Sequence, residues 1–272
     1  MPSRPWWTVG RPVGWHDDEL LGFDLETTGV DRFSDVPVSF ALVTVRRGRV
    51  VDRRTALVNP GRDIPAGATA IHGITSGRAR ALGLPLAEAV ELLADAVVAA
   101  SRRGVPVVGM KLDYDLTILD VQCRLVDGRG LEDRGFCGPV LDALVLDRRF
   151  DRYRKGRRRL VDLCDQYCVS IDHAHDAAAD AEAAVGVVLA LCRRFPRLGC
   201  MQPENLHLAQ GWWHRRWARS YDAWRRDQEM PPLDPREEQW PIALADLPGE
   251  EDLPGEGDVL GMGVDVPVDV PA

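Results

Sequence analysis

Two carboxylates, Asp24 and Glu26, lie two positions apart at the end of the apolar run that covers residues 19–24. On a β-strand, residues i and i+2 point to the same side, so both carboxylates would project together from the end of a buried strand. Like charges held this close are unfavourable unless a cation lies between them, and hard oxygen ligands suit Mg²⁺ or Mn²⁺. An ordinary strand exit, in which Asp24 caps a turn, is the alternative interpretation.

Two later stretches offer ligands for the same cations. Asp115 stands near the start of a predicted helix, where an Asp is more often an N-cap, a role for which Asp113 competes. His175 and Asp180 are five residues apart, and Asp180 lies one turn into an alanine-rich helix whose small side chains leave space for a metal and a substrate. Asp176 or His175 could instead simply precede that helix as its cap.

Taken in order, these residues read Asp-x-Glu, then Asp, then His-x4-Asp. Four carboxylates can hold two divalent ions about 3.5–4 Å apart for the hydrolysis of a phosphodiester. An imidazole can accept the proton of the attacking water near neutral pH. The pattern predicts a two-metal phosphodiester hydrolase with the catalytic residues Asp24, Glu26, Asp115, His175 and Asp180.

Several stretches resemble the motifs of the DnaQ-like 3′–5′ exonucleases of the DEDDh type, a branch of the ribonuclease H-like fold that includes the proofreading epsilon subunit of bacterial DNA polymerase III. The resemblance covers residues 19–195, and its specificity comes from the occurrence of all the motifs in order. The motifs are FDLETTG (23–29), NPG…AIHGIT (59–75), VGMKLDYDLTIL (108–119), VLDALVL (140–146) and LVDLCDQYCV…HAHDAAADA (160–181).

The resemblance implies a role for each of the five catalytic residues. Asp24 would bridge two Mg²⁺ ions, for which Mn²⁺ could substitute. Glu26 and Asp180 would bind the ion that carries the nucleophile, Asp115 would bind the second ion, and His175 would be the general base.

The resemblance also implies a set of substrate contacts near the 3′-terminal nucleotide. Asp142, in VLDALVL, matches a position that we interpret as structural support and not as a metal ligand. The implied substrate-binding residues are Leu25, Thr27, Thr28, His72, Ile74 and Tyr114.

One position departs from the family pattern. Members often carry His-Asn ahead of the aromatic-Asp pair, and this chain has Met110 and Lys111 there. Asp115 is kept, so the departure leaves metal binding in place and bears on contacts with the substrate.

The elements that must position these residues form an α/β pattern. Apolar runs predict strands at 19–24, 36–46, 49–58 and 105–109, and 138–146 reads as a strand that runs into a helix. Arg47 and Gly48 predict a tight antiparallel hairpin. Helical periods mark 85–102, 114–126, 157–167 and 177–194, and 59–77 is expected to be mainly loop. The expected fold is a ribonuclease H-like, mixed five-stranded sheet flanked by helices, with a C-terminal helical extension.

We expect four regions along the chain. They are a lead-in (1–18), the DEDDh exonuclease domain (19–200), a Trp- and Arg-rich helical extension (201–245) and an acidic disordered tail (246–272). The tail carries eight acidic and no basic residues, so it accounts for the formal net charge of -8 and leaves residues 1–245 neutral overall. In the extension, Leu206, Trp213, Trp217, Tyr221 and Trp224 form one apolar stripe, which we expect to pack on its own domain rather than on a partner.

A basic run, DRRFDRYRKGRRRL at 147–160, has two interpretations. It is either a solvated loop and helix start, or an electrostatic track for a single-stranded backbone on which Phe150 and Tyr153 could stack with bases. Because it accompanies a nuclease pattern, we favour the track.

The composition bears on the cellular compartment of the protein. The six cysteines in 272 residues are typical of reduced thiols in a cytoplasmic protein. A zinc site built from Cys164, Cys168 and nearby histidines has an untypical spacing. The chain contains no apolar stretch long enough for a membrane helix and shows no signal-peptide pattern, so no membrane association is expected.

Three functions remain open. The first is a metal-dependent 3′–5′ exonuclease acting on single-stranded ends, with DNA favoured over RNA and a role in proofreading or repair. The second is an exoribonuclease of the oligoribonuclease or RNase T kind. The third is a nucleic-acid- or polymerase-binding module with a decayed site, against which the complete set of five catalytic residues argues. A polymerase or another replication or repair protein is a conceivable partner.

Overall fold

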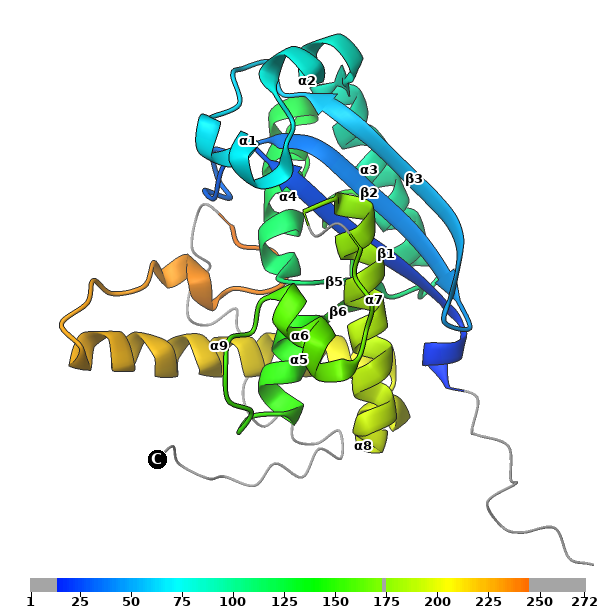
Figure 1. Ribbon diagram of the computed structural model, residues 1–272, viewed down its shortest axis with the longest axis vertical. Helices are drawn as coiled ribbons and strands as arrows, with labels where there is room; N and C mark the ends of the chain where they lie inside the picture. Colours follow the sequence, from blue (N-terminus) through cyan, green and yellow to red (C-terminus); the bar gives the residue numbers. More distant parts are fainter. Residues whose placement is uncertain (1–13, 173–174, 245–272) are drawn as a thin grey trace, which may run out of the picture.

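Residues 14–172 and 175–244 are described by the structure, a computed structural model (Figure 1). The first thirteen residues of the expected lead-in and the whole of the expected acidic tail (246–272) lie outside this range. None of the helices within it combines the length and the apolarity that a membrane crossing requires.

One mixed sheet organises the fold. Its strands are β1 (Glu19–Thr27), β2 (Pro37–Arg46), β3 (Arg49–Asn59), β4 (Leu84–Pro85), β5 (Val107–Gly109) and β6 (Val140–Asp142). Their order in the sheet is β4-β3-β2-β1-β5-β6. The first three strands run antiparallel, whereas β5 pairs parallel with β1 and β6 pairs parallel with β5. The carboxyl ends of β1, β5 and β6 therefore meet at one edge of the sheet.

The predicted hairpin between β2 and β3 is confirmed. Arg47 and Gly48 have φ angles of 51° and 68°, the left-handed conformations that a two-residue turn between twisted strands requires. The predicted helices also form, as α3 (Leu86–Arg102), α4 (Leu112–Asp127), α5 (Ala143–Phe150), α6 (Leu160–Tyr167) and α7 (Ala177–Arg194).

Helices cover both faces of the sheet, as Figure 1 shows. The alternation of side chains along β1 explains this arrangement. On one face, Leu21, Phe23 and Leu25 join a buried cluster with α3 and α4. On the other face, Leu20 joins the buried cluster of α5, α6 and α7. Gly22 lies on this second face. A Cβ atom there would stand 3.1 Å from the Ala181 carbonyl oxygen, so a larger residue would require α7 to shift by a few tenths of an ångström.

Two expectations about the first half of the chain are wrong in detail. The sheet has a sixth strand, because the two-residue β4 pairs parallel with the end of β3. The segment 59–77 contains α1 (Ala66–His72) and the start of α2 (Ser76–Leu82), where mainly loop was expected. Both helices are fixed by a small buried cluster around Ile64 and Ile74.

The C-terminal extension packs into the main core through the first part of α9 (Pro203–Asp227), which follows the short α8 (Pro196–Cys200). Leu206, Ala209 and Trp213 belong to the same buried cluster as α7. The Gln210 side chain donates to the Val140 carbonyl and accepts from the Asp142 amide, both at 2.8 Å. The prediction that the apolar stripe packs on its own domain is therefore confirmed for its first residues.

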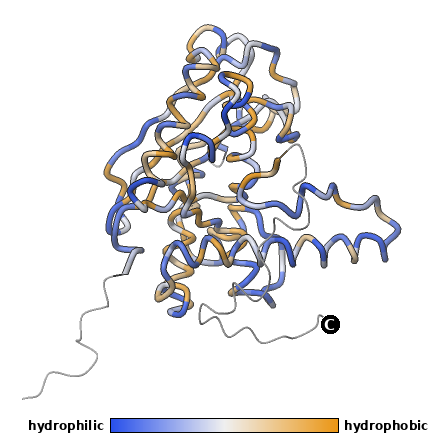
Figure 2. Tube along the Cα trace, turned by 180° about the vertical axis from the view of Figure 1, so that it is seen from behind, coloured by the Kyte–Doolittle hydropathy of each residue, from blue (hydrophilic) through white to orange (hydrophobic). Residues whose placement is uncertain are grey.

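The second part of α9 projects from the body of the molecule (Figure 1). Its last nine residues contain none that is buried, and Figure 2 shows that this arm is mainly hydrophilic. Trp224 is 49% exposed, and its ring stacks on Tyr221, which in turn stacks on Trp217. The chain then returns through η3 (Pro235–Glu238) to α4, where the Ala243 amide donates to the Thr117 hydroxyl at 2.9 Å.

Candidate active site

Strand β1 presents Asp24 and Glu26 on the face that α7 covers. Both side chains are half-buried, whereas Leu25 between them is buried on the opposite face. The pairing of β1 with β2 is irregular between Glu26 and Thr27, so the regular register ends just after the second carboxylate. The expected same-side placement of the two carboxylates is confirmed.

Helix α4 brings Asp115 to this strand. Asp115 is buried in the first turn of α4, and its Oδ1 accepts a hydrogen bond from the Leu25 amide at 3.2 Å. The N-cap residue of α4 is Lys111, in a left-handed conformation, so Asp115 does not serve as the cap. Asp113, the other candidate for the cap, instead pairs with the buried Arg32 at 3.0 Å.

The start of α4 is held by Asp142, at the end of β6. Its carboxylate accepts hydrogen bonds from the Lys111 amide at 3.2 Å and the Leu112 amide at 2.8 Å. It also caps α5 by accepting from the amides of Leu144 and Val145. These contacts agree with the interpretation of Asp142 as a structural support.

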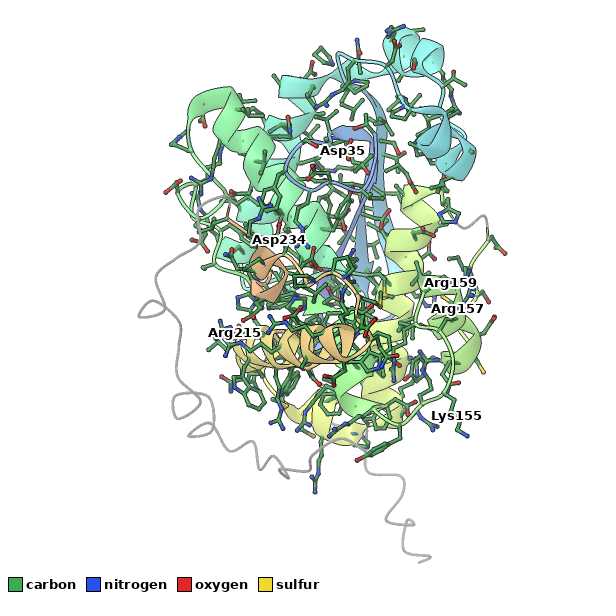
Figure 3. All side chains as sticks on the ribbon, turned by 90° about the vertical axis from the view of Figure 1, so that its left-hand side faces the viewer. Asp35, Lys155, Arg157, Arg159, Arg215 and Asp234 are labelled. Carbon is green, nitrogen blue, oxygen red and sulfur yellow. The ribbon has the colours of Figure 1, made fainter. Side chains whose placement is uncertain are left out.

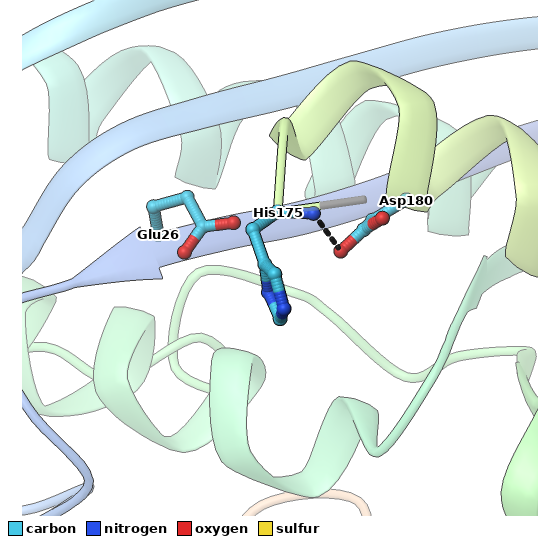
Figure 4. A group of neighbouring side chains, drawn as sticks. All are labelled: Glu26, His175 and Asp180. Carbon is cyan, nitrogen blue, oxygen red and sulfur yellow. Dashed lines mark hydrogen bonds between the residues drawn. The ribbon is translucent and has the colours of Figure 1, made fainter. Parts of the chain in front are cut away.

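Helix α7 brings the remaining carboxylate and the imidazole. Asp176 is its N-cap and accepts hydrogen bonds from the Ala178 and Ala179 amides, which leaves Asp180 and His175 available for other roles. The His175 amide donates to Asp180 Oδ2 at 3.3 Å (Figure 4). His175 has a φ angle of 71°, an uncommon conformation for a residue with a side chain.

Three of these side chains form a potential ligand set for a metal ion. Donor atoms of Glu26, His175 and Asp180 all lie within 4.8 Å of one another (Figure 4). The Oδ1 atom of Asp180 is buried and has no hydrogen-bond partner among the described residues. An unsatisfied buried carboxylate oxygen amid other acidic oxygen donors fits a hard divalent cation.

The other two carboxylates, Asp24 and Asp115, are also buried among acidic groups. Burial raises the pKa of Asp24 well above its usual value, and the charges of Asp115, Asp180 and Glu26 raise it further. Burial also raises the pKa of Asp115 well above its usual value. For Glu26, burial and the Asp180 charge raise the pKa to about 7. Bound metal ions would compensate for the negative charge of such a cluster.

The expected substrate residues divide into two groups. Thr27 and Tyr114 lie side by side, with their hydroxyl oxygens 3.1 Å apart, and Tyr114 also donates to the Gly29 carbonyl. Thr28 is buried, and its hydroxyl donates to Asp35 at 2.6 Å within the loop after β1. Leu25 contributes its amide to Asp115, while its side chain packs in the core.

His72 and Ile74 lie at the end of α1. The Ile74 amide donates to His72 Nδ1 at 3.0 Å, which fixes the orientation of the imidazole. The Ile74 side chain is buried in its own small cluster. Burial lowers the pKa of His72, and the neighbouring His175 lowers it further. The structure thus brings His72 toward the carboxylates and places the Ile74 side chain away from solvent.

Lys111, noted in the sequence only as a departure from the family pattern, proves to lie beside the site. Its side chain is exposed, and its ammonium stands 5.5 Å from the centre of the Tyr114 ring. Its charge lowers the pKa of Asp115, against the larger effect of burial. Among the described residues, neither Cys164 nor Cys168 belongs to a group of donors close enough to share a metal ion, and the nearby His173 lies outside those residues.

The fold and the site together define a class of protein: a nuclease domain in which a mixed sheet gathers carboxylates at the end of its central strand. The exonuclease family named RNase_T matches residues 21–188, so the chain belongs to this exonuclease family. The predicted DnaQ-like exonuclease domain is confirmed. Members of this family depend on divalent metals.

Curated relatives include polymerases and an epsilon-like protein. The PolC-type DNA polymerase III of Lacticaseibacillus paracasei is 28% identical over 209 residues, which cover 72% of this chain and 13% of the relative. A DNA polymerase III subunit epsilon-like protein of Rhodobacter capsulatus is 35% identical over 133 residues, covering 46% of this chain and 16% of the relative. The chain thus spans only about one seventh of the length of these relatives.

Solved structures with a similar fold include E. coli exonuclease I in complex with a dA16 oligonucleotide. Its TM-score is 0.58 at 20% identity, over 73% of this chain and 44% of that chain. The zinc-bound form of the E. coli exonuclease I–ssDNA complex has a TM-score of 0.57 at 21% identity, over 73% and 43% of the two chains. These similarities confirm the predicted ribonuclease H-like fold.

Proposed function

We propose that this protein is a 3′–5′ exonuclease that hydrolyses phosphodiester bonds at single-stranded 3′ ends, with DNA as its substrate. The observation that carries the proposal is the convergence of Asp24, Glu26, Asp115, His175 and Asp180 in a chain that belongs to an exonuclease family. The preference for DNA is supported by the names of the relatives, which are DNA polymerases, and by the DNA oligonucleotide bound in the exonuclease I structure.

The carboxylates are proposed to hold two Mg²⁺ ions, for which Mn²⁺ substitutes. Asp24 would contact both ions, Glu26 and Asp180 the first, and Asp115 the second. When bound, the ions supply an activated water and neutralise charge on the phosphate that is attacked.

His175 is proposed to accept the proton of the attacking water. Oxygen from that water forms a bond to the terminal phosphorus, the bond from phosphorus to the 3′ oxygen of the preceding nucleotide breaks, and a 5′-mononucleotide leaves. Thr27, Tyr114 and His72 would hold the terminal nucleotide, because their polar atoms border the carboxylate cluster. Thr28, Leu25 and Ile74 would support these residues from within the fold.

The test uses dT20 and rU20 oligonucleotides that carry fluorescein at the 5′ end. With Mg²⁺ or Mn²⁺, we expect dT20 to shorten stepwise with release of 5′-mononucleotides, and rU20 to shorten more slowly. EDTA should stop both reactions. Degradation that persists in EDTA, or its absence with both metals, would refute the exonuclease proposal, and faster digestion of rU20 would refute the DNA preference.

A polymerase or another replication or repair protein as partner stays a prediction, as do a cytoplasmic location and the boundaries of the exonuclease domain and extension. The family match at 21–188 falls inside the expected domain of residues 19–200.

A further inference from the structure

The loop that joins α5 to α6, residues 151–159, is fixed from inside by a buried carboxylate. Asp147, in α5, is 0% exposed and pairs with Arg154 at 3.3 Å and with Arg158. The Tyr167 hydroxyl donates to the same carboxylate at 2.6 Å. Arg158 also donates to the Asp151 carbonyl at 3.0 Å, which closes the loop on itself. Two of the cations in the basic run are therefore structural.

Other residues of this loop point outward. Lys155, Arg157 and Arg159 are exposed (Figure 3). Arg159 pairs with Asp162, whereas no ion pair is recorded between the side chain of Lys155 or Arg157 and the described residues. The inward and outward cations of this loop thus have different surroundings, a division that the sequence does not reveal.

An aromatic ring stands among the outward cations. Tyr153 is 83% exposed, and the guanidinium of Arg152 lies over its ring at 5.6 Å. A large ring left in water has no role in the core. Exposed aromatic rings next to cations are the usual means of binding single strands, because bases stack on the rings while the cations contact phosphates.

The loop leads toward the candidate active site. It ends at Arg159, the N-cap of α6, and α6 packs against α7 in one buried cluster. Asp180 lies in the first turn of α7, so the loop and the metal-ligand cluster are linked through these two packed helices. A strand whose 3′ end lies at Asp180 can therefore continue along this face.

We propose that Tyr153, Lys155 and Arg157 bind the single strand behind its 3′ end, with the two cations on phosphates and the ring stacked on a base. The inference rests on the proposed exonuclease function, since it identifies where the substrate of that site is held. The ion pairs of Asp147 fix the loop and thereby hold the outward charges in defined positions. A loop that served only for solubility would not need such fixed positions.

The first test measures binding and requires no cleavage. The variant Lys155→Gln/Arg157→Gln is compared with Arg49→Gln/Arg78→Gln, which removes two exposed cations from β3 and α2. Both are made in an Asp24→Asn background, and fluorescence anisotropy gives the Kd for labelled dT20 at several NaCl concentrations. The slope of log K against log salt should become shallower by about 1.4 in the loop variant, because each lost contact with a single strand contributes about 0.7. An unchanged slope, or an equal change in the control, would overturn the proposal.

The second test concerns the ring. Tyr153→Leu should weaken dT20 binding by about fivefold or more, and Tyr153→Phe should retain it, because stacking needs the ring and not the hydroxyl. Equal losses in both variants would refute stacking. Since phosphates and base faces occur in both nucleic acids, rU20 should lose affinity in parallel, and a loss confined to rU20 would overturn the assignment to a DNA strand.

These results are separable from those of the proposed function. Binding of dT20 that depends on the loop, without any degradation by the wild-type protein, would refute the exonuclease proposal alone. Degradation together with a salt slope unaffected by Lys155→Gln/Arg157→Gln would refute the loop proposal alone.

Discussion

Asp115, in the first turn of α4, accepts a hydrogen bond from the amide of Leu25, the residue between Asp24 and Glu26 on β1. One contact therefore sets the distance between the helix and both strand carboxylates. This contact uses Asp115 Oδ1, and Oδ2 is the atom that we propose binds a metal ion.

Asp115→Asn should keep the hydrogen bond to Leu25 through its amide oxygen while losing the negative charge. We expect the fold to persist and the turnover of dT20 to fall by at least about 100-fold, the cost of removing a group that stabilises the transition state. Steady-state kinetics and circular dichroism check this. The matched control, Asp95→Asn on the exposed side of α3, should turn over like the wild type. Near-normal activity of Asp115→Asn would contradict its assignment as a ligand.

His175→Gln separates the role of base from that of metal ligand, since the imidazole lies within 4.8 Å of both Glu26 and Asp180 donor atoms. If His175 accepts the proton, kcat should fall by about 10²–10⁴-fold, its dependence on pH should flatten, and Mn²⁺ affinity should persist. Titration calorimetry with Mn²⁺ supplies the second measurement. A loss of Mn²⁺ affinity that accounts for the lost rate would instead make His175 a ligand.

Glu26 predicts how stability depends on pH without metal. Burial raises its pKa from 4.5 to about 7 in the folded protein, so between these values the folded state binds the proton more strongly than the unfolded chain does. Its contribution to stability is present at low pH and is lost as pH rises through about 7. In EDTA, the melting temperature of Glu26→Gln minus that of the wild type should therefore increase from pH 5 to pH 8.

The expected gain is a few degrees, since about 1 kcal/mol shifts the melting temperature of a protein of this size by about 2–4 °C. Saturating Mg²⁺ should reverse the order, because the carboxylate that destabilises the free protein binds the ion. If the melting temperatures of Glu26→Gln and the wild type changed equally across this pH range, the raised pKa of Glu26 would be refuted.

Asp142 should matter for positioning and not for chemistry. Asp142→Ala leaves four amides near α4 and α5 without their acceptor, and we expect the free energy of unfolding to fall by at least about 2 kcal/mol. Because the start of α4 carries Asp115, metal affinity should also fall, and high Mg²⁺ should restore much of the rate. Asp142→Asn keeps one acceptor oxygen and should lose less stability and less metal affinity. A rate that added Mg²⁺ leaves unchanged would argue against a positioning role.

The framework of the fold and the grouping of the five candidate catalytic residues could be predicted because both depend on local patterns. The apolar runs of β1 to β3 and the helical periods of α3, α4 and α7 are readable within short windows. Asp24 and Glu26 needed only the alternation of a strand to be placed together.

What the sequence missed depends on contacts between distant segments. The two residues of β4 are too few for any period, and they form a strand only because Val58 and Asn59 lie opposite. The buried Arg32 pairs with Asp113 in α4 and Glu237 in η3, partners that are far away in the sequence. In the basic run, Arg154 and Arg158 turn inward only because Asp147 is buried beneath them.

The side chain of Gln210 completes hydrogen bonding along the outer edge of β6, since β5 occupies the other side of that strand. A shortened chain ending at residue 200 would leave backbone groups of β6 unpaired at this edge of the sheet. It would also expose the apolar residues beneath α9. Unpaired edge strands of different molecules can pair with one another. Preparations of residues 1–200 would then aggregate more readily than chains carried through residue 244.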